Sequence, residues 1–113
     1  MGDVKELERR IGHTFTNRDL VEQAVRHPSW VAEHPDSGDD NQRMEFLGDA
    51  VLQLTISALL FRTFADLDEG VLTRLRAKTV RTEALAEFAQ TLGIDRALNL
   101  GKGEEQHGGR LRP

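Results

Sequence analysis

The stretch that decides the fold of this chain is largely apolar around two acids, and it reads Asn41-Gln42-Arg43-Met44-Glu45-Phe46-Leu47-Gly48-Asp49-Ala50-Val51-Leu52. Residues four apart share one face of a helix, so Glu45 and Asp49 are predicted to lie one turn apart. A carboxylate among apolar neighbours needs a hydrogen-bond partner, an opposite charge or a bound cation. The two acids are therefore interpreted as one site.

The apolar pattern continues from Met44 to Phe64 on nearly every side, which is typical of a helix covered by other elements. We therefore expect this helix to be the buried centre of the domain. At about 100° per residue, one narrow polar stripe remains on it, formed by Gln42, Glu45, Asp49 and Gln53. Gly48 costs about 1 kcal/mol relative to alanine inside a helix, so it predicts close packing by a neighbour there.

Two helices are predicted before this segment. Asp3 followed by Glu6 resembles a capping box, and Gly12 is a typical end for the helix that Asp3 begins. Asn17 is the predicted cap of the second helix, which Pro28 ends. The residues of this second helix that are expected to face inward are Leu20, Val21, Ala24 and Val25.

Two more helices are predicted after the central one. Asp66 to Gly93 carries two helical patterns, and Thr82 is the candidate cap of the second. The segments 28–40 and 100–113 contain many Gly, Pro and acidic residues and are predicted to be loops. Five helices with short connections indicate a single domain of the all-α class.

The composition limits the kinds of function that fit. The chain has 113 residues and a formal charge of −4, which argues against a surface that binds nucleic acid everywhere. Its basic cluster, Arg74, Arg76, Lys78 and Arg81, is interpreted as a solvated helix face. Without cysteine, neither a disulfide framework nor a thiolate metal site can form. We expect a cytoplasmic protein outside the membrane, because no leader pattern is visible and the longest apolar run, Ala58–Phe61, is short.

The paired acids favour a metal site over other chemistry. Two nearby like charges are relieved by a proton or a cation, and carboxylate oxygens suit Mg²⁺, with Mn²⁺ as a substitute. Such a site indicates phosphodiester chemistry. His27 and Ser29 lack the acid partner of a nucleophilic triad and are interpreted as structural. His13, His34 and His107 do not have the spacing of zinc ligands. The segment from Gly101 to Glu105 lacks the Gly-Lys-Ser/Thr ending of a phosphate-binding loop.

The segment from Asn41 to Leu52 resembles the signature of the ribonuclease III family of double-stranded-RNA endonucleases, typically Asn-Glu-Arg-Leu-Glu-Phe-Leu-Gly-Asp-Ala-Val-Leu. The resemblance extends to the segments 27–30, 69–77 and 100–105 and to Gly108 and Gly109. It implies a helical, homodimeric domain that cuts both RNA strands by Mg²⁺-assisted hydrolysis. On the matching positions, Glu45 and Asp49 are implied to be catalytic metal ligands, and Phe46 is implied to anchor the dimer in a pocket of the partner subunit.

The chain departs from the family pattern in two places. Gln42 stands where the signature usually has Glu, so it is kept as a secondary residue of the site face. In the family, an Asp and a Glu three residues apart on a later helix complete the metal site, and the chain stops at Pro113 before such a helix. We therefore expect residues 1–113 to be a ribonuclease III-like endonuclease domain that is incomplete at its C-terminus, without a double-stranded-RNA-binding domain.

Three functions stay open on the sequence. The first is a double-stranded-RNA-specific endoribonuclease of which this chain is an incomplete domain. The second is a non-catalytic helical module that dimerises or recognises the shape of RNA. The third is a metal-dependent hydrolase of small phosphorylated substrates. A missing terminal helix also predicts that apolar surface of the central helix is exposed.

Overall fold

The computed structural model describes residues 3–111, and it confirms the all-α class. Its helices in chain order are α1 (Val4–Ile11), α2 (Arg18–Ala24), α3 (Pro28–Glu33), α4 (Gln42–Thr63), α5 (Glu69–Val80), α6 (Thr82–Leu92), α7 (Ile94–Ala97) and α8 (Lys102–Gln106). Short 3₁₀ turns cover Pro35–Ser37 and Gly109–Leu111. The last two residues of the loop expected over 100–113 lie outside the described part.

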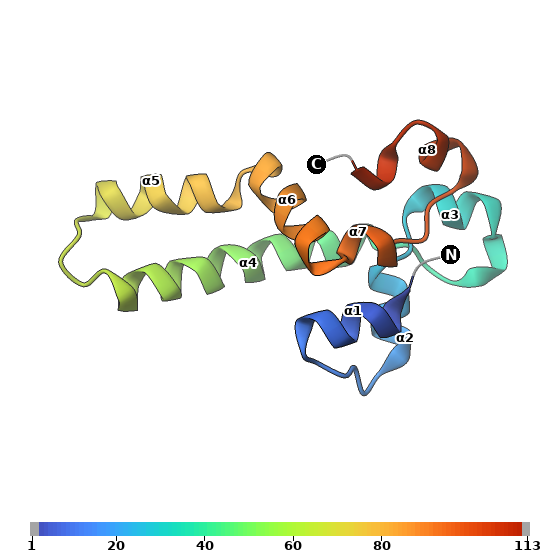
Figure 1. Cartoon of the computed structure of the whole chain (residues 1–113), viewed down its shortest axis with the longest axis horizontal. Coiled ribbons are helices and arrows are strands. Elements are labelled where there is room, and N and C mark those ends of the chain that lie inside the picture. Colours follow the sequence, from blue (N-terminus) through green and yellow to red (C-terminus); the bar gives the residue numbers. More distant parts are fainter. Residues whose placement is uncertain (1–2, 112–113) are drawn as a thin grey trace.

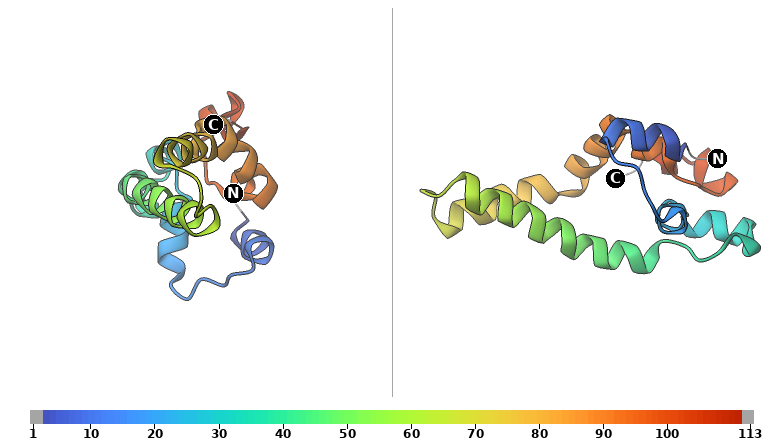
Figure 2. Two further views of the ribbon diagram at one scale, coloured as in Figure 1. Left: turned by 90° about the vertical axis from the view of Figure 1, so that its left-hand side faces the viewer. Right: turned by 90° about the horizontal axis from the view of Figure 1, so that it is seen from below.

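The molecule has a long arm and a compact end (Figure 1). The arm is the antiparallel pair α4 and α5, and the compact end contains α1, α2, α3, α7 and α8, with α6 between the two parts. The right-hand view of Figure 2 shows the arm extending away from the compact end, and the left-hand view looks along the arm from its tip. The radius of gyration is 16.0 Å, whereas a compact domain of this length has about 13 Å. The chain is therefore elongated.

The small core lies in the compact end. Leu7, Val25 and Ala97 are buried there, and Val4, Ile94 and Leu98 pack against them. A parallel bridge joins the segments that follow α2 and α7, because Asn99 N donates to Val25 O at 2.8 Å and His27 N donates to Asn99 O at 3.1 Å. Segments more than 70 residues apart in the chain are thus held together.

The predicted limits of the first two helices are largely confirmed by their local hydrogen bonds. Asp3 Oδ1 accepts from the third residue of α1, and Gly12 ends that helix with a φ of 71°, in the left-handed region that favours glycine. Asn17 Oδ1 accepts from Asp19 N at 3.1 Å and so caps α2. The inward face of α2 is narrower than predicted, since Val21 is buried and Leu20 is exposed.

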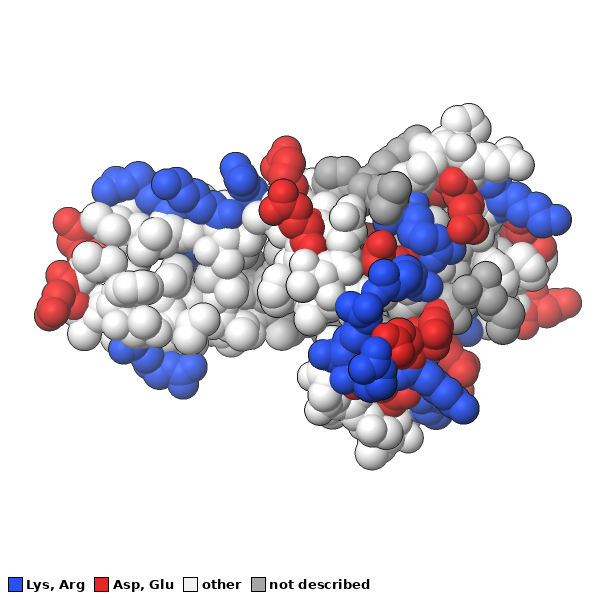
Figure 3. Space-filling model, viewed as in Figure 1, with Lys and Arg blue, Asp and Glu red and all other residues white. Residues whose placement is uncertain are grey.

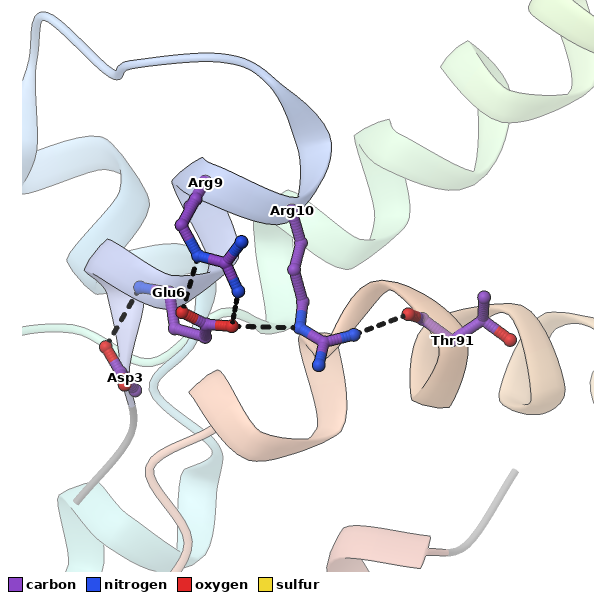
Figure 4. Close-up of polar contacts among 5 residues, drawn as sticks. All are labelled: Asp3, Glu6, Arg9, Arg10 and Thr91. Atoms are coloured by element: carbon purple, nitrogen blue, oxygen red, sulfur yellow. Dashed lines mark hydrogen bonds and ion pairs between the residues drawn. The ribbon is translucent and has the colours of Figure 1, made fainter.

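Helix α1 is also fixed to α6 by side chains, as Figure 4 shows. Arg10 Nη1 donates to Thr91 O at 3.1 Å, and the Glu6 carboxylate accepts from both Arg9 and Arg10. These hydrogen bonds, chiefly the one from Arg9, lower the pKa of Glu6 to about 2. The compact end therefore has ionic contacts at its surface in addition to its small core.

Two segments predicted as loops contain helices. Pro28 occupies the first turn of α3, where its missing N–H costs nothing, so it begins a helix rather than only ending one. Helix α8 starts at Lys102, whose N–H donates to Glu33 Oε2 at 2.7 Å. That partner lies far away in the sequence, which is why the local pattern did not reveal this helix. Thr82 is the first residue of α6 and not its cap, because the cap position falls on Arg81.

The prediction that the central helix is buried is wrong for this chain. Helix α4 packs mainly against α5, and none of its 22 residues is buried. Phe46 is 84% exposed and Phe61 is 74% exposed, while the other large exposed side chains of α4 are Leu47, Val51, Leu54 and Leu59. The composition indicates that α4 requires a cover, but the described residues supply that cover on the α5 side only. The expected exposure of apolar surface on this helix is thus confirmed.

Helix α4 also bears on the expectation that the protein stays outside the membrane. Its most apolar 18-residue window has a mean hydropathy of 1.5, and by length and composition the helix is long and apolar enough to cross a bilayer. Core helices of water-soluble proteins satisfy the same criteria. The earlier expectation rested on an uninterrupted apolar run, whereas a span needs only a high average over its length.

Candidate functional site

Side chains from the α2–α4 region hold the first turn of α4 in place. Gln23 Nε2 donates to Asp40 O at 3.1 Å, and Asn41 Nδ2 donates to Ala24 O at 2.9 Å. Asp40 Oδ1 in turn accepts from Gln42 N at 3.0 Å. These contacts join the beginning of α4 to the end of α2, so the acids of α4 extend from an anchored helix end. Gln23 carries no sequence signal for this role, whereas Asn41 belongs to the signature quoted above.

A hollow on α4 brings the predicted site residues together. It is lined by Gln42, Glu45, Phe46, Asp49 and Ala50. The prediction that Glu45 and Asp49 form one site with Gln42 beside them is consistent with this arrangement, and Gln53 lies outside the lining. Both acids are exposed, so their surroundings are more open than the apolar sequence around them indicated.

The two carboxylates are available to a ligand. Within residues 3–111, neither Glu45 nor Asp49 makes a side-chain hydrogen bond or ion pair. Glu45 lies in the first turn of α4, where the helix dipole favours negative charge. The described part of the chain contains no group of three or more His, Cys, Asp or Glu side chains placed to hold a metal ion. The hollow therefore offers a pair of acids and an amide.

The acids of α8 do not add to this pair. The Glu105 carboxylate accepts from Arg110 at 3.1 Å, and that hydrogen bond lowers the pKa of Glu105. Glu105 is thus engaged within its own segment, at the 3₁₀ turn that follows α8. Glu104 and Glu105 both lie in α8, and not in the loop that was expected there.

His27 and Ser29 have the structural role that was predicted. His27 Nδ1 accepts from Ser29 N at 3.1 Å and caps α3, and Ser29 Oγ accepts from Gly101 N at 2.8 Å. A Cβ on Gly101 would lie 2.5 Å from Ser29 O, so only glycine allows this approach. These contacts join α3 to the start of α8.

Phe46 and Gly48 present open surface on α4. Phe46 extends from the rim of the acidic hollow with most of its ring exposed. A Cβ on Gly48 would meet nothing within 4 Å. The predicted close packing at Gly48 is therefore wrong for the chain by itself, because no described element lies over that face.

A second hollow lies between the two helices of the arm. It has a volume of about 390 Å³, and its lining residues are Ser57, Leu60, Phe61, Glu69, Leu72, Thr73 and Arg76. Arg76 Nη1 donates to Ser57 Oγ at 2.9 Å across the two helices. The lining is mainly apolar, so this hollow suits an aromatic or aliphatic group.

Comparisons with family models and with curated proteins point to one and the same family. A family model described as ribonuclease-III-like matches residues 17–113. Ribonuclease 3 of Listeria innocua is 46% identical over 114 residues, which cover 100% of this chain and 50% of that protein. Ribonuclease 3 of a Geobacillus species is 51% identical over 110 residues, which cover 96% of this chain and 45% of that protein. The chain thus spans about half the length of the curated relatives it matches.

Solved structures show the same fold. The nuclease domain of ribonuclease III from Campylobacter jejuni superimposes with a TM-score of 0.86 at 33% identity, covering 98% of this chain and 74% of that chain. A second structure of that domain gives a TM-score of 0.85 at 34% identity, with 100% and 74% coverage. The first of them is described as flexible in the region involved in dimer formation. The resemblance drawn from the residues is confirmed.

Proposed function

This chain belongs to the ribonuclease III family, and from that premise we propose that it works as part of an endoribonuclease that cuts double-stranded RNA. The observation that carries the proposal is the hollow on α4, where Glu45 and Asp49 lie side by side with Gln42. Both acids belong to the segment that matches the family signature. Hydrolysis of a phosphodiester needs negative charge to be stabilised and water to be activated, and paired carboxylates serve this by holding a cation.

The residues present suit Mg²⁺, or Mn²⁺ in its place, as part of a ligand set. Carboxylate oxygens are the ligands these hard cations prefer, and both acids of the hollow lack a competing partner within residues 3–111. Glu45 and Asp49 would hold the cation, and the Gln42 amide would lie beside them. When bound, such a cation supplies charge stabilisation at the phosphate and activation of water.

The pair alone is a weak site, because two carboxylates leave most of the coordination to water. The proposed enzyme takes further acidic ligands from sequence outside residues 1–113. Support comes from the solved nuclease domains, which are longer than this chain, since the matched region covers 74% of their length. In this view α4 contributes one side of the metal centre.

The proposed assembly is a homodimer formed through the arm, with Phe46 as its anchor. Support comes from the exposed apolar side of α4, from the exposed Phe46 ring, and from the hollow between α4 and α5, which offers space for a ring of a second copy. The related Campylobacter jejuni domain is described as having a region involved in dimer formation.

The proposal is tested first by the binding of Mn²⁺ to the chain, followed by electron paramagnetic resonance. Glu45→Gln and Asp49→Asn are each expected to weaken binding by at least about tenfold, because each removes one charged ligand. Glu87→Gln is the matched control, since Glu87 is an exposed acid on α6, away from the hollow. Unchanged Mn²⁺ binding in the first two variants would contradict the metal site.

The second test is cleavage of a labelled RNA duplex in Mg²⁺. It uses the chain itself and a chimera that adds the part of the Campylobacter jejuni nuclease domain which this chain does not cover. Cleavage by the chimera is expected to fall at least about a hundredfold with Glu45→Gln or Asp49→Asn, and to persist with Glu87→Gln. Cleavage that survives both substitutions would refute the assignment of this site.

A non-catalytic module that dimerises or binds RNA is the second candidate. It is favoured by the observation that residues 3–111 hold no cluster of three or more metal-ligating side chains. RNA binding and dimer formation without cleavage, in the chimera as well as in the chain, would support this candidate over the enzyme.

A further inference from the structure

The face of α5 that points away from α4 carries a row of cations. Arg74 and Lys78 lie four residues apart on one side of α5, and Arg81 follows three residues later as the cap residue at the end of that helix. All three are exposed. At about 100° per residue, their mean direction lies roughly 170° from that of Leu72 and Arg76, which line the hollow facing α4. We call these three residues the basic row.

The side chains of the basic row have no partner within residues 3–111, whereas four arginines of the compact end do. Arg9, Arg10, Arg18 and Arg110 form ion pairs with carboxylates. Within residues 3–111, no hydrogen bond or ion pair involves the side chains of Arg74, Lys78 or Arg81. Like charges at these spacings destabilise a helix by a few tenths of a kcal/mol per pair. The row is therefore unfavourable for the helix unless it meets a negative partner.

The row is also local and bounded. Figure 3 shows blue side chains along the outer edge of α5, with red side chains over the α4–α5 connection at one end and over α6 at the other. The acids of these flanking segments are Asp66, Asp68, Glu69, Glu83 and Glu87. In a chain with a formal charge of −4, this positive strip is not a consequence of general basicity. It indicates one narrow anionic partner.

We propose that the basic row binds the phosphate backbone of an RNA duplex, as a contact separate from the acidic hollow on α4. The row is roughly 10 Å long at 1.5 Å per helical residue, and over such a length one strand of a nucleic-acid duplex presents several phosphates, with about 3.4 Å of axis per phosphate in B-DNA. Three cations therefore match about three phosphates of one strand. The inference rests on the proposed function, because that function supplies a duplex as the partner.

The test measures binding of a fluorescein-labelled 24-base-pair RNA duplex to the full chain by fluorescence anisotropy, in EDTA so that no cleavage occurs. The variant combines Arg74→Gln, Lys78→Gln and Arg81→Gln. The matched control combines Lys5→Gln, Arg62→Gln and Arg96→Gln, which removes the same charge from exposed positions off the row that also lack ion pairs within residues 3–111. Circular dichroism checks that both variants keep the helical content of the parent chain.

The row variant is expected to bind at least about tenfold more weakly at 50 mM salt, and the control by less than about threefold. Each phosphate contact contributes about 0.9 to the slope of log K against log salt, so the slope should fall by about 2 to 3 in the row variant only. An equal loss in both variants would reduce the row to a general charge effect and overturn the proposal. Absence of duplex binding by the parent chain at 50 mM salt would also overturn it.

These results stay separate from those for the catalytic proposal. Glu45→Gln and Asp49→Asn should abolish cleavage and leave binding through the basic row intact. Loss of binding in the row variant, without any cleavage by the parent chain or the chimera, would support the row and count against the enzyme. Cleavage by the chimera, with no effect of the row substitutions on duplex binding, would support the enzyme and count against the row.

Discussion

The compact end and the arm differ in how far each is covered by the chain itself. In the compact end, short helices bury Leu7, Val25 and Ala97 and are joined by hydrogen bonds between distant segments. In the arm, two long helices have each other as their main neighbour, and α4 buries none of its residues. A long and largely apolar helix is thus left without a single buried residue. Helical length and apolar content alone do not make a core, because a core needs a second surface.

This difference gives the arm and the compact end separate tasks. Contacts of the compact end fix the first turn of α4 through Gln23 and Asn41, and so position the acids of the hollow. The arm presents large apolar side chains, a receiving hollow and the basic row to the outside. An exposed surface with several large apolar side chains along one helix is typical of an interface. We therefore regard the compact end as the anchor of the site and the arm as the surface for partners.

Truncating one leucine in each part should show most clearly how much the compact end and the arm each contribute to stability. Leu7→Ala is expected to lower the free energy of unfolding by about 2–5 kcal/mol, because it leaves a cavity in a small core. Leu54→Ala removes the same atoms from a side chain that is 71% exposed, so it should change stability by less than about 0.5 kcal/mol. Urea unfolding at low protein concentration measures both. Equal losses would mean that the arm is as well packed as the compact end.

Association should depend on the arm alone. Phe46→Ala is expected to raise the dissociation constant of self-association roughly ten- to hundredfold, since burying a phenylalanine contributes about 1.5–3 kcal/mol. Leu20→Ala is the control, because Leu20 is also an exposed apolar residue but lies on the compact end. Analytical ultracentrifugation gives both constants. The assignment of α4 as the interface fails if Leu20→Ala weakens association as much as Phe46→Ala does.

Acid should act on the compact end through Glu6. The pKa of this carboxyl is lowered from 4.5 to about 2, chiefly by the hydrogen bond from Arg9. Between these values the unfolded chain takes up a proton that the folded chain does not, so stability falls as pH falls through this window. The effect is small, because the ion pair is at the surface. Glu6→Gln should flatten the dependence of stability on pH between 2 and 4.5, measured by thermal unfolding at several pH values.

Glu87→Gln is the control for that experiment, because Glu87 is exposed and has no ion pair within residues 3–111. Its substitution should leave the pH dependence close to that of the parent chain. A steep loss of stability below pH 4.5 that persists unchanged in Glu6→Gln would place the acid sensitivity elsewhere.

Much of the site could be predicted from the residues. The spacing of Glu45 and Asp49 places both on one helix face with Gln42, and the structure has all three on one hollow. The supporting contacts of Gln23 and Asn41 could not be predicted, because each joins residues 17 positions apart. The apolar pattern alone did not separate a covered α4 from an exposed one, since an all-round apolar pattern is the same in both cases.

The resemblance of the signature motif indicated the family, and local chemistry determined the helix limits at Asp3, Gly12, Asn17 and Gly93 and the pairing of two acids. Those features depend on hydrogen bonds and periodicity within a few residues, which a sequence displays directly. Only the tertiary structure decided that α3 and α8 are helices joined by Ser29 and Glu33, and that α4 lies open. These outcomes depend on which distant segments meet, because burial and long-range hydrogen bonds are set by three-dimensional packing.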